Sequence, residues 1–210
     1  MASLQSVRKS FARYFTDPVV TVLEKTHITP NTVTIIGTLI TIAAAVLVSL
    51  DHLFAAGFVV LFAGLFDMFD GALARRTNQV TRFGGVLDST LDRLSEAAIL
   101  IGITAFYTSQ QNLWGVAVAG MALISSQLVS YIRARAEAIG INCEVGVFTR
   151  PERVVILSIG LLLGGFNNVL LIALIVIAVL SFTTAGQRLM YVKSKLKDEK
   201  SKPEFKSQNR

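Results

Sequence analysis

The sequence contains few of the residues that build disulfide frameworks or zinc centres. Its 210 residues include one cysteine, Cys143, which excludes an intrachain disulfide and a cysteine-rich metal site. The two histidines, His27 and His52, are far from each other and from other ligand types. A zinc centre is therefore not expected.

Charged residues are also scarce. They make up 16% of the chain, against 52% hydrophobic residues, and the mean hydropathy is +0.58. Long apolar runs interrupted by charged gaps predict an all-α integral membrane protein with several spans rather than a soluble domain. The net charge of +6 then reflects Lys and Arg that face anionic lipid and phosphorylated substrates, so no nucleic-acid partner is expected.

Six hydrophobic segments are long enough, or nearly so, for the roughly 20 residues that a helix needs to cross a bilayer. They cover residues 31–50, 53–74, 84–107, 113–136, 151–165 and 168–191, of which the fifth is short. The connections at 51–52, 109–112 and 165–168 contain no Lys or Arg. The positive-inside rule therefore predicts a multi-pass protein of the cell membrane with both termini and the active site on the cytoplasmic side.

Two polar flanks frame the six-helix domain, which we predict over residues 29–192. Residues 1–28 carry basic residues between apolar ones spaced three or four apart, which favours an amphipathic helix on the membrane surface. An ordinary first-domain helix is the alternative. Residues 193–210 form a lysine-rich cytoplasmic tail, which we expect to continue the last helix and then lose order.

Four carboxylates fall inside the predicted spans, where they are expensive to bury. Asp67 and Asp70 are three residues apart at the end of the second span, and Asp88 and Asp92 are four apart at the start of the third. Both spacings put a pair on one helical face. We expect the pairs to converge around divalent cations, and all-oxygen ligands favour Mg²⁺ or Mn²⁺.

Glycines and an arginine surround these aspartates. Gly71 and Gly84 remove side chains where a ligand can approach closely, and Arg75 follows Asp70 by five residues. With Ala74, the motif specifies eight positions in a 26-residue window, a pattern too specific to arise from composition alone.

The motif matches, at every fixed position, the signature of the CDP-alcohol phosphotransferase family. This resemblance implies six transmembrane helices, usually a homodimer, and a site for two metal ions at the cytoplasmic face. It implies that Asp67, Asp70 and Asp88 are metal ligands, and that Asp92 contributes to the metal site and acts as general base. The residues implied to bind the CDP-linked lipid are Asn31, Thr34, Gly71, Arg75 and Thr81.

The resemblance also implies the reaction. An alcohol hydroxyl, deprotonated by Asp92, attacks the lipid-side phosphorus of CDP-diacylglycerol, and CMP leaves. Intramembrane carboxylates alone would fit the cation relay of an ion-coupled transporter equally well. The glycines and the arginine at their full spacing favour the enzyme.

Arginines at three other cytoplasmic helix ends concern the acceptor alcohol. Arg133, Arg153 and Arg188 lie on different predicted helices, and guanidinium groups bind phosphate through paired donors. We therefore expect the acceptor to carry a phosphate. The positive-inside rule explains such arginines without any function, and we favour that rule, or a salt bridge with Glu137 or Glu152, for Arg135.

Residues 125–157 and the segment around Asp88 resemble the phosphatidylinositol-phosphate synthases of actinobacteria. In that family a lysine and two arginines bind inositol phosphate, and they match Arg133, Arg153 and Arg188. Arginine replaces the lysine at position 133. The implied product is phosphatidylinositol phosphate made from CDP-diacylglycerol and inositol phosphate. Phosphatidylglycerophosphate synthases and archaetidylinositol phosphate synthases remain alternatives.

Overall fold

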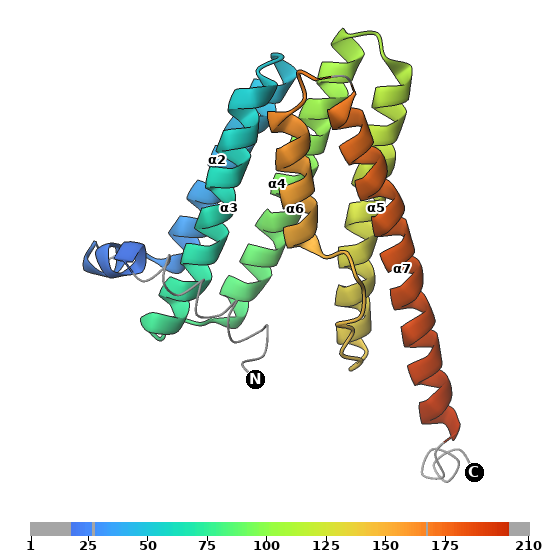
Figure 1. The fold of residues 1–210 in the computed structure, drawn as a ribbon. Coiled ribbons are helices and arrows are strands. Elements are labelled where there is room, and N and C mark those ends of the chain that lie inside the picture. Colours follow the sequence, from blue (N-terminus) through green and yellow to red (C-terminus); the bar gives the residue numbers. More distant parts are fainter. Residues whose placement is uncertain (1–17, 27, 167, 202–210) are drawn as a thin grey trace, which may run out of the picture. The chain divides into compact units, whose positions relative to one another are not determined.

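The computed structural model describes residues 18–26, 28–166 and 168–201, and the regular secondary structure of these residues is entirely helical (Figure 1). The chain forms two compact units that divide after Gly102, within helix α4. The predicted all-α class is confirmed for the described residues.

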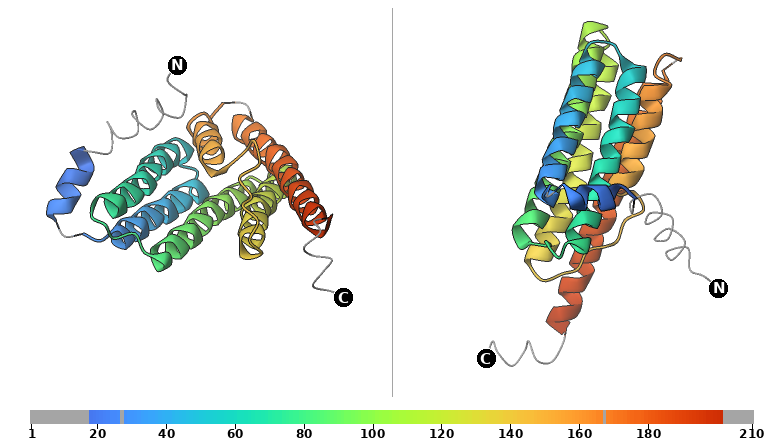
Figure 2. Two further views of the ribbon diagram at one scale, coloured as in Figure 1. Left: turned by 90° about the horizontal axis from the view of Figure 1, so that it is seen from below. Right: turned by 90° about the vertical axis from the view of Figure 1, so that its left-hand side faces the viewer.

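The first unit contains α2 (Pro30–Ser49), α3 (Leu53–Arg76) and the part of α4 (Arg82–Ser109) that ends at Gly102. Thr29 caps the start of α2 by accepting a hydrogen bond from the backbone N–H of Thr32 (3.3 Å), and Pro30 occupies the first turn. A short turn joins α2 to α3, so the two helices run side by side in opposite directions (Figure 2).

Small residues let the helices of this unit approach each other closely. A Cβ atom at Gly37 would lie 2.9 Å from Cβ of Phe66, and one at Gly102 would lie 2.4 Å from the carbonyl oxygen of Ala45. Both distances are too short for a side chain, so these glycines mark the crossings of α2 with α3 and with α4. The crossing at Gly37 holds the N-terminal half of α2 against the C-terminal half of α3, where Asp67 and Asp70 lie.

Residues 18–25 form a further helix that is attached to the end of α3. Val20 is buried with Val33 and Leu73, and Arg76 pairs with Glu24 at 3.1 Å. The helical prediction for the N-terminal segment is thus confirmed for these residues. Residues 1–17 and 27 lie outside the described part of the chain, and the location of the segment on a membrane surface stays a prediction.

The second unit contains α5 (Leu113–Ala138), α6 (Arg150–Leu162) and α7 (Val169–Ser201), and α7 packs against both other helices. At Gly160 a Cβ atom would lie 2.7 Å from Cβ of Ala173, so α6 and α7 pack without an intervening side chain. Thr149 and Glu152 form a capping box at the start of α6. The backbone N–H of Thr149 at the start of the helix is therefore satisfied by Glu152.

Four helices of the described residues are long and apolar enough to cross a membrane. They are α2, α3, α5 and the Val169–Lys197 part of α7. The six predicted segments all form helices, but α4 and α6 do not reach this standard. Charged residues, including Asp88, Asp92 and Glu96, occupy the first half of α4, and the 13 residues of α6 extend about 20 Å, less than the roughly 30 Å of a hydrocarbon core.

Most helix ends lie close to their predicted positions. The exceptions are α6, which ends at Leu162 before the predicted residue 165, and α7, which continues through the predicted tail to Ser201. The expected helical extension beyond residue 192 is therefore confirmed up to Ser201. Residues 202–210 lie outside the described part of the chain.

Candidate active site

The first unit contains a pocket of about 310 Å³ at the cytoplasmic end predicted for α3 and α4, and we call it the aspartate pocket. It is formed by the start of α2, the end of α3, the α3–α4 turn and the start of α4. Its lining consists of Pro30, Asn31, Thr34, Asp70, Gly71, Ala74, Arg75, Gln79, Val80, Thr81, Gly84, Gly85 and Asp88. All five residues predicted to bind the CDP-linked lipid are in this lining.

Asp70 is the most firmly held polar side chain of the pocket. It is 5% exposed, and the hydroxyl of Thr34 donates a 2.6 Å hydrogen bond to its Oδ2. The backbone N–H of Gly71 donates to its Oδ1. A buried carboxylate needs such donors, and they fix the direction in which its remaining lone pairs point. Thr34 thus orients Asp70 in addition to lining the pocket.

The other aspartates are brought near Asp70 to different degrees. The charges of Asp67 and Asp88 both act on Asp70, and Asp88 shares its pocket. Asp67 and Asp92 are half-buried and are not part of the pocket lining. Within the described ranges, no three acidic, histidine or cysteine side chains are gathered closely enough to hold a metal ion. The structure therefore brings Asp70 and Asp88 into one pocket, and the convergence of all four carboxylates on metal ions stays a prediction.

Two glycines make room for polar groups around the pocket. A Cβ atom at Gly71 would lie 3.3 Å from Nη1 of Arg75, so the guanidinium group folds back over this turn of α3. A Cβ atom at Gly84 would lie 2.9 Å from Oγ1 of Thr81 and 3.2 Å from Oδ1 of Asn31. The missing side chain at Gly84 therefore allows α2 and the α3–α4 turn to present polar atoms side by side.

The α3–α4 turn contributes lining residues that the sequence did not single out. Gln79 donates its backbone N–H to the carbonyl of Ala74 (2.9 Å), and Asn78 adopts a φ of 55°. Asn tolerates this left-handed conformation better than most residues. The turn places Gln79 and Val80 on the pocket. The family resemblance had indicated Thr81 of this turn, and the fixed spacing between the two halves of the motif is the signal that could have indicated its neighbours.

The second unit brings together the three arginines predicted for the acceptor, Arg133, Arg153 and Arg188, which we call the arginine cluster. The charges of Arg133 and Arg153 both act on Arg188. Arg153 and Arg188 are 2% and 3% exposed, whereas Arg133 is exposed. Burying two cations next to a third is unfavourable unless an anion or strong acceptors compensate. The cluster is therefore suited to a phosphate group.

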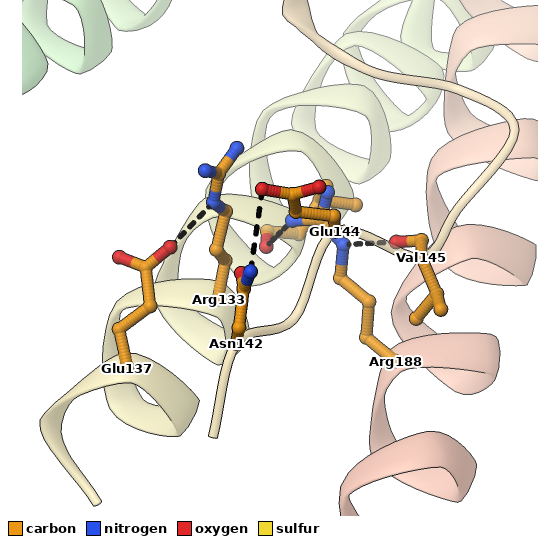
Figure 3. A network of polar contacts seen from close by, with 7 residues as sticks. Arg133, Glu137, Asn142, Glu144, Val145 and Arg188 are labelled. Atoms are coloured by element: carbon orange, nitrogen blue, oxygen red, sulfur yellow. Dashed lines mark hydrogen bonds and ion pairs between the residues drawn. The ribbon is translucent and has the colours of Figure 1, made fainter. Parts of the chain in front are cut away.

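Arg188 is held by two backbone carbonyls. Its Nε donates to the carbonyl of Val145 in the α5–α6 loop (2.9 Å), and its Nη1 donates to the carbonyl of Val129 on α5 (2.6 Å). Figure 3 shows the side chain reaching from α7 to these two segments, while Arg133 pairs with Glu137 along α5 at 2.8 Å. The position of Arg188 is thus set by the fold of the second unit.

Two expected salt-bridge partners have other roles. Glu137 pairs with Arg133, four residues before it, rather than with Arg135. Glu152 accepts hydrogen bonds from the backbone N–H (2.9 Å) and the hydroxyl of Thr149, so it caps its own helix. Spacing explains both corrections, because Glu152 is three residues after the N-cap and Glu137 is one helical turn after Arg133.

Together, the helical fold and the aspartate pocket define a membrane protein whose polar site combines carboxylates, an arginine and glycines that leave room for a ligand. The chain belongs to the CDP-alcohol phosphatidyltransferase family, whose model matches residues 27–185. Members of this family are enzymes that depend on a divalent metal. The match covers the whole aspartate pocket and the first two arginines of the cluster, but it ends before Arg188.

Individual relatives agree with this assignment. The chain is 38% identical over 192 residues to the phosphatidylinositol phosphate synthase of Mycobacteroides abscessus, covering 89% of this chain and 87% of that protein. It is 39% identical over 187 residues to the archaetidylinositol phosphate synthase of Methanothermobacter thermautotrophicus, covering 88% and 92%.

Solved structures of one relative are also similar. The phosphatidylinositol phosphate synthase of Mycobacterium tuberculosis with CDP-DAG bound superposes with a TM-score of 0.78 at 38% identity, covering 84% of this chain and 92% of that one. The same enzyme in complex with manganese and citrate gives a TM-score of 0.77 and covers 84% and 88%.

Proposed function

We propose that this protein transfers the phosphatidyl group of CDP-diacylglycerol to inositol phosphate, which gives phosphatidylinositol phosphate and CMP. The observation that carries the proposal is the aspartate pocket, in which Asp70 and Asp88 lie with the residues predicted for the CDP-linked lipid. Family membership favours this enzyme over an ion-coupled transporter. The similarity to phosphatidylinositol phosphate synthases supports the choice of acceptor.

The residues of the aspartate pocket fit a divalent metal. Their ligand atoms are carboxylate oxygens, and the charges of Asp67 and Asp88 already act on Asp70, so a cation there would relieve their repulsion. We assign Asp67, Asp70, Asp88 and Asp92 to two Mg²⁺ or Mn²⁺ ions. When bound, the ions polarise the pyrophosphate and neutralise charge on the leaving CMP.

The protein's own residues bind and orient the CDP-linked lipid. Thr34 holds Asp70 in one orientation. Asn31, Thr81 and the space above Gly84 present neutral polar groups to a nucleotide, and Arg75 offers a guanidinium group to a phosphate. Apolar side chains such as Leu39, Phe58 and Phe62 are exposed on α2 and α3. They contact the lipid chains of the substrate, which remain in the bilayer.

Asp92 takes the proton of the acceptor hydroxyl. The hydroxyl oxygen forms a bond to the lipid-side phosphorus, the bond from that phosphorus to the CMP oxygen breaks, and the proton ends on the carboxylate. Asp92 follows Asp88 by one helical turn of α4, so a base and a pocket residue share one rigid element. A base on a helix is positioned more accurately than one on a loop.

The arginine cluster binds the phosphate that the acceptor already carries. Arg153 and Arg188 are buried, and the backbone carbonyls fix Arg188 before any ligand arrives. A site built for a phosphate discriminates strongly against an alcohol that lacks one, because the arginine donors are then left unsatisfied. This property distinguishes inositol phosphate from inositol, but it does not by itself distinguish inositol phosphate from glycerol 3-phosphate.

We extend the proposal to the cellular arrangement. All six long segments contribute to a membrane domain in the cell membrane, with α4 and α6 shielded by neighbouring helices or by a second copy in a homodimer. Both termini and both substrate sites face the cytoplasm, where the basic residues lie. A reporter that is active only in the cytoplasm would test this orientation. It should be active when fused to the C-terminus and inactive when inserted at residues 109–112.

The proposed function is tested by CMP release from CDP-diacylglycerol in detergent or vesicles, with Mg²⁺ and one acceptor at a time. We expect release with inositol phosphate and its loss on chelation with EDTA. Release with glycerol 3-phosphate but not with inositol phosphate would show that glycerol 3-phosphate is the acceptor. The protein would then be a phosphatidylglycerophosphate synthase. No release with any alcohol would overturn the transferase. An archaeol-based CDP-lipid as the second donor tests the archaetidylinositol phosphate alternative.

A further inference from the structure

The loop between α5 and α6, residues 139–149, is packed firmly against its own unit. Ile141, Cys143 and Phe148 are 6%, 0% and 4% exposed, which is unusual for a connecting segment on a protein surface. Ile141 and Cys143 form a cluster with Ala136 at the end of α5, and Val145, Tyr191 and Val192 pack against it. The loop is therefore held in one path along α5 and α7.

Gly146 lies at the point where this loop touches α7. Its φ is +126°, a conformation that residues with a side chain rarely adopt. A Cβ atom there would lie 2.5 Å from Cγ2 of Thr184 and 3.4 Å from Nε of Arg188. Both the backbone conformation and the contact therefore require glycine at this position.

The carbonyl of the residue that precedes Gly146 holds Arg188. That carbonyl belongs to Val145 and accepts the 2.9 Å hydrogen bond from Nε of Arg188. An arginine side chain has five N–H groups. Because one is used by Val145 and one by Val129, the guanidinium plane is fixed and the other groups are left to bind a ligand.

We propose that Gly146 is a positioning residue for the acceptor: it seats the α5–α6 loop against Thr184 so that Val145 holds Arg188 ready for the acceptor's phosphate. The proposal rests on the proposed function in one respect, since it takes Arg188 to bind that phosphate. It assigns acceptor recognition partly to a residue without a side chain, in a loop outside the aspartate motif. A displaced loop would release Nε of Arg188 and let the guanidinium group turn away.

The test is steady-state kinetics of the full-length Gly146→Ala variant, with CDP-diacylglycerol and inositol phosphate varied separately. We expect the KM for inositol phosphate to rise about tenfold and the KM for CDP-diacylglycerol to stay within about twofold. A double variant tests whether the contact is the cause. Adding Thr184→Ser to Gly146→Ala removes Cγ2 of residue 184, which is the atom that the new Cβ would meet. We expect it to return the acceptor KM part of the way to the wild-type value, because the contact is relieved while the backbone strain at φ +126° remains.

Two glycines of the same unit serve as controls. Gly186→Ala alters α7 where a Cβ atom meets nothing within 4 Å, and we expect unchanged kinetics. Gly140→Ala has the strained φ of +81° but also meets nothing within 4 Å. It should lower the unfolding temperature without changing the acceptor KM, which separates general backbone strain from the contact at Arg188.

If Gly146→Ala does not fold, Thr184→Ile is measured instead, because it enlarges the other side of the same contact without backbone strain. An unchanged acceptor KM in the folded variant, or an equal rise in both KM values, would overturn the role of Gly146. Either result leaves the proposed function intact, since the wild-type protein would still release CMP. Wild-type protein that releases no CMP with any acceptor would overturn both.

Discussion

The aspartate pocket and the arginine cluster hold their charges in different ways. In the pocket, Asp70 is oriented by a threonine hydroxyl and a local backbone N–H, while Arg75 and Thr81 are exposed. In the cluster, Arg188 is buried and donates to carbonyls of two other segments, one of them a packed loop. The pocket keeps side chains that can adjust, whereas the cluster holds Arg188 in place beforehand.

This difference matches the two substrates that we propose. A CDP-linked lipid is large and flexible, and most of its affinity can come from many weak contacts and from its chains in the bilayer. A small phosphorylated alcohol offers few contacts, so its site gains from donors that are already in place, because less ordering is needed on binding. Substitutions in the two regions should therefore change different kinetic constants.

The largest effect is expected for Asp70→Asn, which keeps the size of the side chain but removes its charge. CMP release should fall about a thousandfold, since metal ions contribute several kcal/mol to such transition states. EDTA should have the same effect on the wild-type protein. The matched control is Asp51→Asn in the exposed α2–α3 turn, where φ is 65° and Asn is well tolerated. Near-normal activity of Asp70→Asn would remove that residue from the metal site.

Asp92→Asn should lower kcat by about a hundredfold to ten-thousandfold, the usual contribution of a general base. The KM for inositol phosphate should change little, because the proton is transferred only in the transition state, whereas the KM for CDP-diacylglycerol should rise because Asp92 is also assigned to the metal site. Circular dichroism and the unfolding temperature would establish that the variant is folded. A variant that keeps most of its kcat would show that another group takes the proton.

Arg153→Lys tests the arginine cluster with charge retained. We expect the KM for inositol phosphate to rise about tenfold to a hundredfold, because lysine cannot reproduce the planar, paired donors of a guanidinium group. The KM for CDP-diacylglycerol should not change. Arg135→Lys, at an exposed position on α5 outside the cluster, is the control. A rise in the KM of the CDP-lipid instead would mean that the two regions have been assigned to the wrong substrates.

The smallest effect is expected for Gly84→Ala in the aspartate pocket. The new Cβ would be 2.9 Å from Oγ1 of Thr81 and 3.2 Å from Oδ1 of Asn31, and both side chains can shift. We expect the KM for CDP-diacylglycerol to rise about threefold with no change for the acceptor. Gly120→Ala on α5, whose Cβ would meet nothing within 4 Å and which lies outside the pocket lining, should behave as wild type. Equal effects of the two substitutions would argue against the predicted contact.

Much of the pocket could be predicted from the sequence because its residues occupy regular helices. Helical spacing places Asp70, Gly71 and Arg75 near one another on α3, and it places Gly84 and Asp88 one turn apart on α4. The family resemblance then added Asn31 and Thr34 from α2. Helical spacing could not predict with the same certainty that all four carboxylates converge. It fixes the positions of the Cα atoms but leaves the χ angles of the side chains open.

The features that sequence reasoning missed depend on loops and on packing between segments far apart in the chain. The sequence around Gly146 does not indicate that the carbonyl of its neighbour Val145 accepts a hydrogen bond from Arg188, which is 43 residues later in the chain. Gln79 and Val80 are equally ordinary turn residues until the turn places them on the pocket. The short α6 illustrates another limit, since its capping box marks where the helix begins, while Gly164 and Gly165 after its C-terminus place its end only to within a few residues.

The most direct test of the central claim compares inositol phosphate with inositol as acceptors for the same protein preparation, with CDP-diacylglycerol and Mg²⁺ held constant. We expect kcat/KM for CMP release to be at least about a hundredfold higher with inositol phosphate, because only that acceptor satisfies the buried arginines. Equal values for the two acceptors would contradict the assignment of the arginine cluster to a phosphate.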